Sequence, residues 1–181
     1  MYPTSDFNII LKNIIMEFIK TAVVNRPIEE VWELLGNQYG EAYKWAGGLY
    51  HSEGFGTPTL ENAPFSSRAC KTSQGNITEE IRVFDPENYK LVYEVVKGFP
   101  GFVEVGKNQW SLSPLENKTQ VHMHLVIETK GIVGAIMGPM MGMQLKKIVS
   151  TVLEDFKHYV ETGNPSPSKA KEMAKHGQLV A

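Results

Sequence analysis

Residues 49–129 constrain the fold of this chain most, because apolar and polar side chains alternate through them and turn-forming residues recur at short intervals. Alternation broken by turns predicts short strands that pair antiparallel with their neighbours. The turn chemistry lies at residues 73–76, 85–88, 98–106 and 114–118. We therefore place six consecutive strands near residues 49–54, 66–73, 76–84, 90–97, 106–113 and 120–129.

One strand and two short helices are predicted before these six strands. Residues 18–24 are rich in β-branched side chains, which favours a strand. Pro27, followed by two acidic residues, predicts a helix that ends at Gly36. A second short helix over residues 41–46 stops at a pair of glycines. We expect residues 1–16 to form an N-terminal extension outside the fold.

A long helix is predicted after the last strand. From Met141 the apolar residues recur at helical spacing as far as Val160, which predicts an amphipathic helix of about 20 residues, or ~30 Å. Residues 131–143 are rich in glycine and methionine and contain Pro139, so we expect an irregular, mobile gate there. Residues 162–181 carry few apolar groups and are expected to form a solvated tail.

The turns also predict which residues lie opposite each other. A hairpin tip at Gln74 and Gly75 places Cys70 opposite Glu79 and Arg68 opposite Ile81. The next turn places Ile81 opposite Tyr93, Glu79 opposite Val95, and Val83 opposite Leu91. One face of the sheet is then apolar: Ile77, Ile81, Val83, Leu91, Tyr93, Val95, Trp110, Met123, Leu125 and Ile127. The other face is polar: Thr78, Glu80, Arg82, Lys90, Glu94, His122, His124 and Glu128.

The apolar face needs a cover, and the long helix is the largest element that can supply one. A strongly twisted sheet of seven strands is not filled by one helix, so an internal cavity is expected between them. We predict cavity walls that include Ile81, Tyr93, Val95, Trp110, Met123 and Leu145.

Composition narrows the classes of function. The 181 residues suggest one domain of residues 17–161 with short flanking segments, and the net charge of −2 gives no electrostatic footprint for nucleic acid. Cys70 is the sole cysteine, which predicts no internal disulfide and fits a cytoplasmic location. No apolar run is long enough to span a bilayer, and no signal peptide is expected.

Four short motifs in this order carry a resemblance to a known superfamily. They are residues 26–32, residues 75–81 leading to Phe84 and Asp85, residues 91–94, and residues 153–157. Together they resemble the helix-grip, START-like (SRPBCC) superfamily, which includes lipid-transfer domains, birch-pollen-type allergens, abscisic-acid receptors and polyketide cyclase/dehydrase-like proteins. The chain is most similar to the polyketide cyclase/dehydrase-like members. The resemblance covers residues 17–161.

That resemblance implies an α+β helix-grip fold, with a seven-stranded curved antiparallel sheet wrapped around a long C-terminal helix. It does not extend to the hormone receptors. Only Ser73 to Asn76 are available for their gate loop. Their latch histidine and arginine have no counterpart in residues 98–106, and their pocket lysine has no match near Gly47 and Gly48. The resemblance therefore argues against a hormone receptor, and the fold alone decides no function.

Glu79 is the most informative candidate residue, because the alternation turns this carboxylate inward. A buried carboxylate must be paired, hydrogen-bonded or neutral. Three roles follow for Glu79: a structural ion pair with Arg68, a polar contact for a ligand, or a general base. In a catalytic role, Glu79 or Tyr93 would move a proton. The full set of expected ligand contacts is Arg68, Cys70, Glu79, Ile81, Tyr93, Val95, Asn108, Trp110, Met123, Leu125, Met137, Met141 and Leu145.

Other reactive residues favour simpler interpretations. His122 and His124 share one strand face, which is the polar face, and no third ligand is evident, so no metal site and no cofactor are expected. Cys70 has no inward histidine near it and is interpreted as a small buried hydrophobe.

The leading hypothesis is a carrier or sensor of a small hydrophobic molecule, such as a lipid, an isoprenoid or an aromatic compound. Two alternatives remain open. One is an enzyme of the polyketide cyclase/aromatase or dehydratase kind that uses the same cavity. The other is a protein-interaction domain that docks through its methionine-rich segment and tail.

Overall fold

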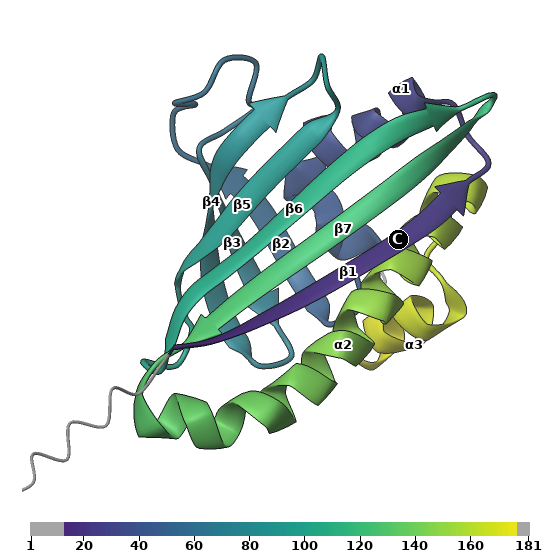
Figure 1. Cartoon of the computed structure of the whole chain (residues 1–181). Coiled ribbons are helices and arrows are strands. Elements are labelled where there is room, and N and C mark those ends of the chain that lie inside the picture. Colours follow the sequence, from purple (N-terminus) through teal and green to yellow (C-terminus); the bar gives the residue numbers. More distant parts are fainter. Residues whose placement is uncertain (1–12, 177–181) are drawn as a thin grey trace, which may run out of the picture.

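A single antiparallel sheet of seven strands curves around one long helix in the computed structural model, which describes residues 13–176 (Figure 1). The strands lie in the order β1-β7-β6-β5-β4-β3-β2, so consecutive strands from β2 to β7 pair with each other. Their bounds are β1 (Ile14–Val24), β2 (Leu49–Phe55), β3 (Ser67–Thr72), β4 (Gly75–Asp85), β5 (Lys90–Lys97), β6 (Val103–Leu115) and β7 (Lys118–Thr129). The predicted meander and helix-grip fold class are confirmed.

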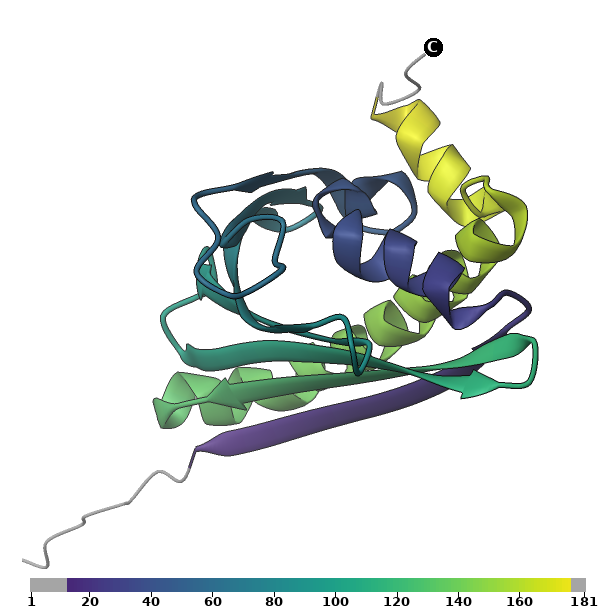
Figure 2. The same ribbon diagram turned by 90° about the horizontal axis from the view of Figure 1, so that it is seen from above.

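The helices lie on the concave side of the sheet (Figure 2). Between β1 and β2 the chain forms α1 (Ile28–Trp32), the π-helical turn η1 (Glu33–Asn37) and the 3-10 helix η2 (Tyr39–Lys44). After β7 come α2 (Gly131–Thr162) and α3 (Pro167–Lys175). No helix in residues 13–176 is long and apolar enough to cross a membrane.

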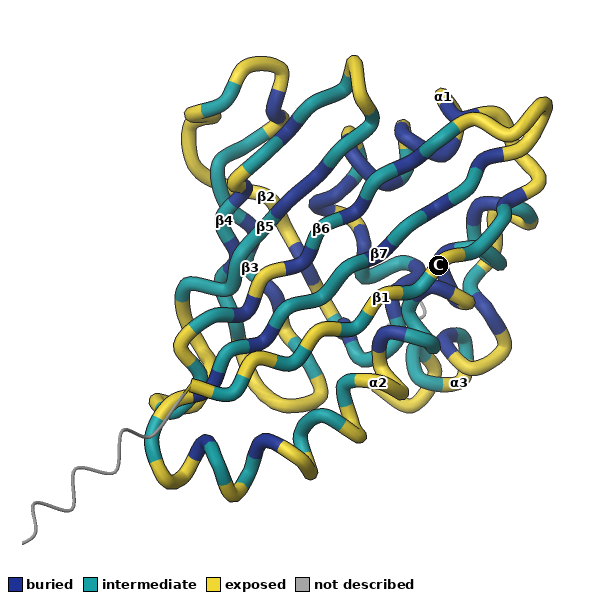
Figure 3. Tube along the Cα trace, in the orientation of Figure 1, coloured by how far each residue is buried: buried dark blue, intermediate teal, exposed yellow. Residues whose placement is uncertain are grey.

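The core forms where α2 meets the sheet and the short helices. Trp45, Trp110 and Phe156 are almost fully buried, and their ring centroids lie 4.8–6.2 Å apart. Figure 3 shows buried residues concentrated along the sheet and the second half of α2, while the first half of α2 carries much exposed surface. The aromatic cluster therefore anchors one end of the helix and leaves the other end lightly packed.

The hairpin between β3 and β4 corrects one predicted register. Thr72 pairs with Gly75, so Arg68 lies opposite Glu79 and Cys70 lies opposite Ile77. The turn is shorter than expected because Gly75 takes a φ of 130° and the Thr72 hydroxyl accepts a hydrogen bond from the Gln74 amide at 3.1 Å. The shift is two residues, which equals the side-chain period, so the predicted inward face survives.

A bulge in β4 corrects a second pairing. Ile81 lies opposite Tyr93 and Glu79 opposite Val95, as predicted, but the register shifts after Ile81. Phe84 then pairs with Leu91 and is buried, while Val83 is only half-buried. The prediction that Val83 faces inward is wrong, because a bulge inserts one extra residue and reverses the faces beyond it.

Three predicted boundaries are also wrong. The long helix begins at Gly131, not Met141, and runs through Pro139. The segment expected as a solvated tail instead forms α3, capped by Ser166, with Lys169 fully buried. β1 begins at Ile14, inside the expected extension. Residues 1–12 and 177–181 lie outside the described residues.

Candidate functional site

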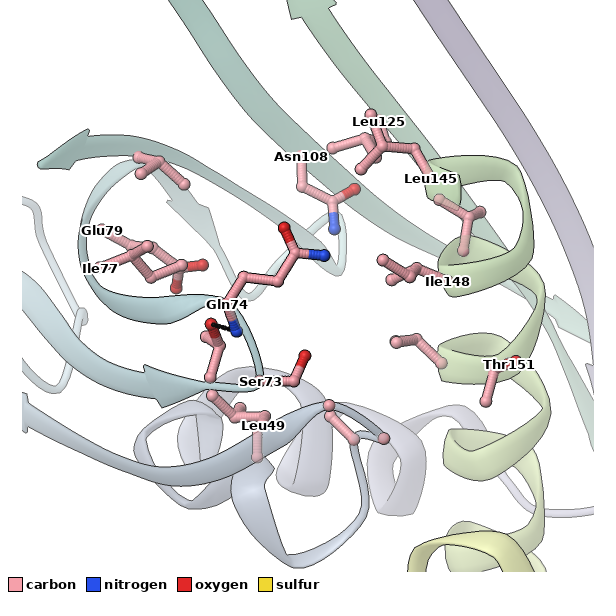
Figure 4. Close-up of a pocket in the computed structure, with 18 of the residues that line it drawn as sticks. Leu49, Ser73, Gln74, Ile77, Glu79, Asn108, Leu125, Leu145, Ile148 and Thr151 are labelled. Atoms are coloured by element: carbon pink, nitrogen blue, oxygen red, sulfur yellow. Dashed lines mark hydrogen bonds between the residues drawn. The ribbon is translucent and has the colours of Figure 1, made fainter. Parts of the chain in front are cut away.

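A cavity of about 520 Å³ lies between the concave face of the sheet and α2. This volume falls within the range of about 300–1,000 Å³ that is typical of sites for small molecules. Figure 4 shows Leu145, Ile148 and Thr151 projecting from α2 toward it, with Glu79 and Asn108 on the sheet side. Gln74, from the turn between β3 and β4, extends into the space between them.

Most residues predicted as ligand contacts do line this cavity. They are Arg68, Glu79, Tyr93, Val95, Asn108, Trp110, Met123, Leu125 and Leu145. They come from β3 to β7 and from the middle of α2, so elements far apart in sequence meet around one space.

The remaining four predicted contacts lie off the cavity lining. Ile81 is buried in the hydrophobic core, and Cys70 is buried with its Sγ 3.7 Å from Glu79 Oε2. Met137 and Met141 belong to the first half of α2, which packs along β1 beyond the cavity. No residue of the expected gate, 131–143, lines the cavity; the lining includes Gly98 and Phe99 from the loop between β5 and β6 instead.

One end of the cavity is closed by a buried ion pair. Arg68 donates from Nε at 2.8 Å and from Nη2 at 2.6 Å to the same carboxylate oxygen, Glu79 Oε2. Both residues are buried, with relative exposures of 4% and 6%. The Tyr39 hydroxyl donates to that oxygen at 2.6 Å, and Arg68 Nη1 donates to the Tyr39 carbonyl at 2.9 Å.

Sequence reasoning missed Tyr39. Its ring lies against the guanidinium, with Arg68 Cζ 3.7 Å from the ring centroid; the Tyr93 ring lies beside the Tyr39 ring, 4.9 Å from it and 5.4 Å from Arg68 Cζ. Tyr39 is on η2, far from β3 in the sequence, and the periodicity of η2 gives no sign that its aromatic ring meets the sheet. The one signal in the sequence was the inward placement of Arg68, because a buried guanidinium often packs against an aromatic ring.

These contacts set the protonation states around the pair. Burial alone would lower the pKa of Arg68, but the adjacent Glu79 carboxylate raises it on balance, so the guanidinium stays charged. Burial raises the pKa of Tyr93 to about 12 and that of the Cys70 thiol to about 12. Burial also holds the pKa of Tyr39 well above its usual range. These three groups keep their protons at neutral pH.

Two polar atoms at this end have no partner among the described residues. Glu79 Oε2 receives the hydrogen bonds of its carboxylate, and none reaches Oε1. Asn108 donates from Nδ2 to the Tyr93 hydroxyl at 2.8 Å, whereas its Oδ1 is buried without a partner. The cavity lining is largely apolar. At the closed end, Glu79 Oε1 and Asn108 Oδ1 can each still accept a hydrogen bond.

The opposite rim is held by α3. Lys169 donates to the Leu49 carbonyl at 2.7 Å and to Glu172 at 2.7 Å, while Gly47 donates to the buried Asp155 at 3.1 Å. Ser166 also donates to Asp155. Lys169 and Glu172 border the cavity. The C-terminal helix thus completes one wall of the site.

No group of three or more potential metal ligands occurs within residues 13–176. His122 and His124 lie on the outer face of the sheet, where they contact Thr21 at 3.1 Å and Glu17 at 3.1 Å.

Comparison with known families identifies the chain. Residues 17–161 match the model of a family described as polyketide cyclase / dehydrase and lipid transport. The chain belongs to this family. No curated protein matched the chain.

Solved structures with the same fold agree with this family. Ara h 8.0201 aligns with a TM-score of 0.62 at 15% identity, over 81% of this chain and 97% of that one. A protein from Thermus thermophilus aligns with a TM-score of 0.64 at 16% identity, over 80% and 97%. A START superfamily protein from Mycobacterium smegmatis gives 0.58 at 18% identity, over 80% and 94%. At these identities the likeness shows the fold alone.

Proposed function

We propose that this protein binds a small, largely apolar and uncharged ligand that carries a hydroxyl group, and that it performs no reaction on it. The observation that supports this proposal is a cavity of about 520 Å³ in which the buried Arg68–Glu79 pair is already neutralised within the protein. An anionic ligand would meet Glu79, and a cationic one would meet Arg68. A neutral ligand avoids both repulsions.

The hydroxyl follows from the two atoms that lack partners. Glu79 Oε1 accepts hydrogen bonds, and so does Asn108 Oδ1. If the Asn108 amide is turned over, its free side donates instead, and a hydroxyl still satisfies it because a hydroxyl both donates and accepts. A ligand that leaves the buried Asn108 Oδ1 unpaired loses binding energy.

The cyclase or dehydratase alternative has less support. Proton transfer at neutral pH is favoured by a group whose pKa lies near 7, and burial raises the pKa of Tyr93 and of Cys70 to about 12. The single cysteine is buried and has no partner thiol in the sequence, which supports the cytoplasmic location that we also propose.

Matched ligands test the proposal. We expect 2-naphthol to displace a neutral fluorescent probe, N-phenyl-1-naphthylamine, about tenfold more strongly than 2-methylnaphthalene, and 2-naphthoate to bind weakest. Native mass spectrometry of the purified protein should also detect a copurified neutral molecule. A protein that binds none of these compounds and always purifies empty would refute ligand binding. Equal affinity for naphthol and methylnaphthalene would refute only the hydroxyl preference.

A further inference from the structure

The first half of α2 presents an apolar face to solvent. Ile132, Ile136 and Met143 have relative exposures of 63%, 70% and 71%, and Val133 and Met140 are exposed beside them. At 3.6 residues per turn these five side chains fall within an arc of about 100° and extend over ~18 Å of helix. We call this set the α2 outer stripe. Its width is that of a helix face normally buried against a core.

Glycines on the opposite side of the helix explain why the stripe is exposed. Gly134, Gly138 and Gly142 face the sheet; a Cβ on Gly134 would lie 3.0 Å from Thr129 Cβ, and one on Gly142 would lie 3.2 Å from Met16 Sδ. The helix runs beside β1 (Figure 1). It approaches the sheet through its smallest residues, and its largest apolar side chains are exposed. An ordinary surface helix has the reverse arrangement, so packing within the chain does not account for the stripe.

The charges within this part of α2 have one sign. Residues 131–153 contain two charged residues, Lys146 and Lys147, and no acid. Lys147 lies on the same side of the helix as the stripe by helical spacing, one turn after Met143. Lys130, which precedes the helix, is paired with Glu104 at 3.4 Å and adds no free charge. Exposed apolar side chains flanked by lysines are typical of helices that lie in the interface of an anionic bilayer.

The stripe leads to the cavity. Leu145 and Ile148, which follow Met143 within the next turn and a half of α2, line the cavity, and Ile148 remains partly exposed at 39% (Figure 4). Phe99, from the loop between β5 and β6, is another partly exposed apolar residue that lines the cavity. An apolar ligand leaving a membrane at this face would thus have a short path over apolar surface.

We propose that the α2 outer stripe docks on the surface of an anionic lipid bilayer, with its five apolar side chains in the acyl boundary and Lys146 and Lys147 at the headgroups. This interaction goes beyond ligand binding, and its measurement needs no cavity ligand. Failure of one proposal therefore leaves the other intact.

Flotation of the full chain with lipid vesicles tests the proposal. We expect binding to vesicles of phosphatidylcholine and phosphatidylglycerol, and about tenfold weaker binding when Ile136 is changed to Asp. The matched control is Ile19→Asp, which introduces the same charge at an equally exposed isoleucine (65%) on the outer side of β1 and should bind within about twofold of the unmodified protein. Circular dichroism should show both variants folded.

The charge component has its own control. Lys146→Glu should weaken binding to the anionic vesicles about threefold at low salt, and the effect should fade at high salt. Lys171→Glu, at an exposed position on α3, should not weaken it. If the protein does not bind the vesicles of phosphatidylcholine and phosphatidylglycerol, or if the Ile136 and Ile19 variants bind them equally, the proposal is overturned. A dimer in sedimentation velocity that Ile136→Asp converts to a monomer, without vesicle binding, would assign the stripe to a second copy instead.

Discussion

Removing one member of the Arg68–Glu79 pair should destabilise the protein far more than removing both. Glu79→Leu leaves two Arg68 donors, now bonded at 2.8 and 2.6 Å, without an acceptor in a residue that is 4% exposed. Hydrogen bonds to charged groups contribute about 1.5–3 kcal/mol each, and breaking a buried pair costs about 3–5 kcal/mol. Out of a total stability of about 5–15 kcal/mol, that loss is large.

The double variant Arg68→Met, Glu79→Leu should recover most of this loss, because neither charge is left buried alone. Urea unfolding followed by tryptophan fluorescence, without ligand, gives the free energy of unfolding of all four proteins. We expect each single variant to lose about 4 kcal/mol, or about 10 °C in melting temperature, and the double variant about 1–2 kcal/mol. If the two single effects simply add, the pair is not coupled and our account of the closed end is wrong.

Three further changes probe the cavity, the thiol and the helix. Leu145→Trp should fill the cavity and weaken probe binding at least about tenfold with little change in stability; unchanged affinity would place the ligand elsewhere. Because burial raises the pKa of the Cys70 thiol from its ordinary value of 9.0 to about 12, the folded protein keeps a proton that the unfolded chain loses. The free energy of unfolding should therefore fall by about 1.4 kcal/mol per pH unit over that range, and Cys70→Ala should remove this contribution in alkaline titration. Gly142→Ala, whose new Cβ would lie 3.2 Å from the sulfur of the flexible Met16 side chain, should raise the free energy of unfolding by about 0.5–1 kcal/mol, whereas Gly134→Ala, at 3.0 Å from Thr129 Cβ, should not; equal effects would contradict the close packing of α2.

The sheet could be predicted because its signals are local. Alternation places Glu79, Tyr93 and Trp110 on one face whatever the exact turn, and the two-residue error at the β3–β4 hairpin left that face unchanged. The β4 bulge shifts the register by one residue, so it does change which residues face inward. Nothing in the residues around Arg82 indicates an extra residue in the strand, so the sequence places Val83 on the wrong face.

The errors in the helices have a different origin. Glycine and Pro139 lower intrinsic helix propensity, and that propensity predicted an irregular segment before Met141. Close packing of Gly134 against Thr129 of β7, and contact of Gly138 with Ile14 of β1, override this low propensity. α3 was missed because its few buried contacts are polar: Lys169 is expected to be solvated unless the Leu49 carbonyl it meets is known. Tyr39 was missed because its partners, Arg68 and Glu79, are distant from it in the sequence.

The docking of α3 has a consequence for where this domain ends. The family match stops at residue 161, yet residues beyond it complete hydrogen bonds within the matched part. Ser166 donates to Asp155, which also accepts from the Gly47 amide, and the Gly48 amide donates to Glu172 at 2.8 Å. A protein cut at the family boundary would uncover a buried carboxylate and leave the Leu49 carbonyl without Lys169. The packed structure of this chain therefore extends beyond the residues that match the family. Any shortened version intended for crystallisation or display should keep the chain through at least residue 175.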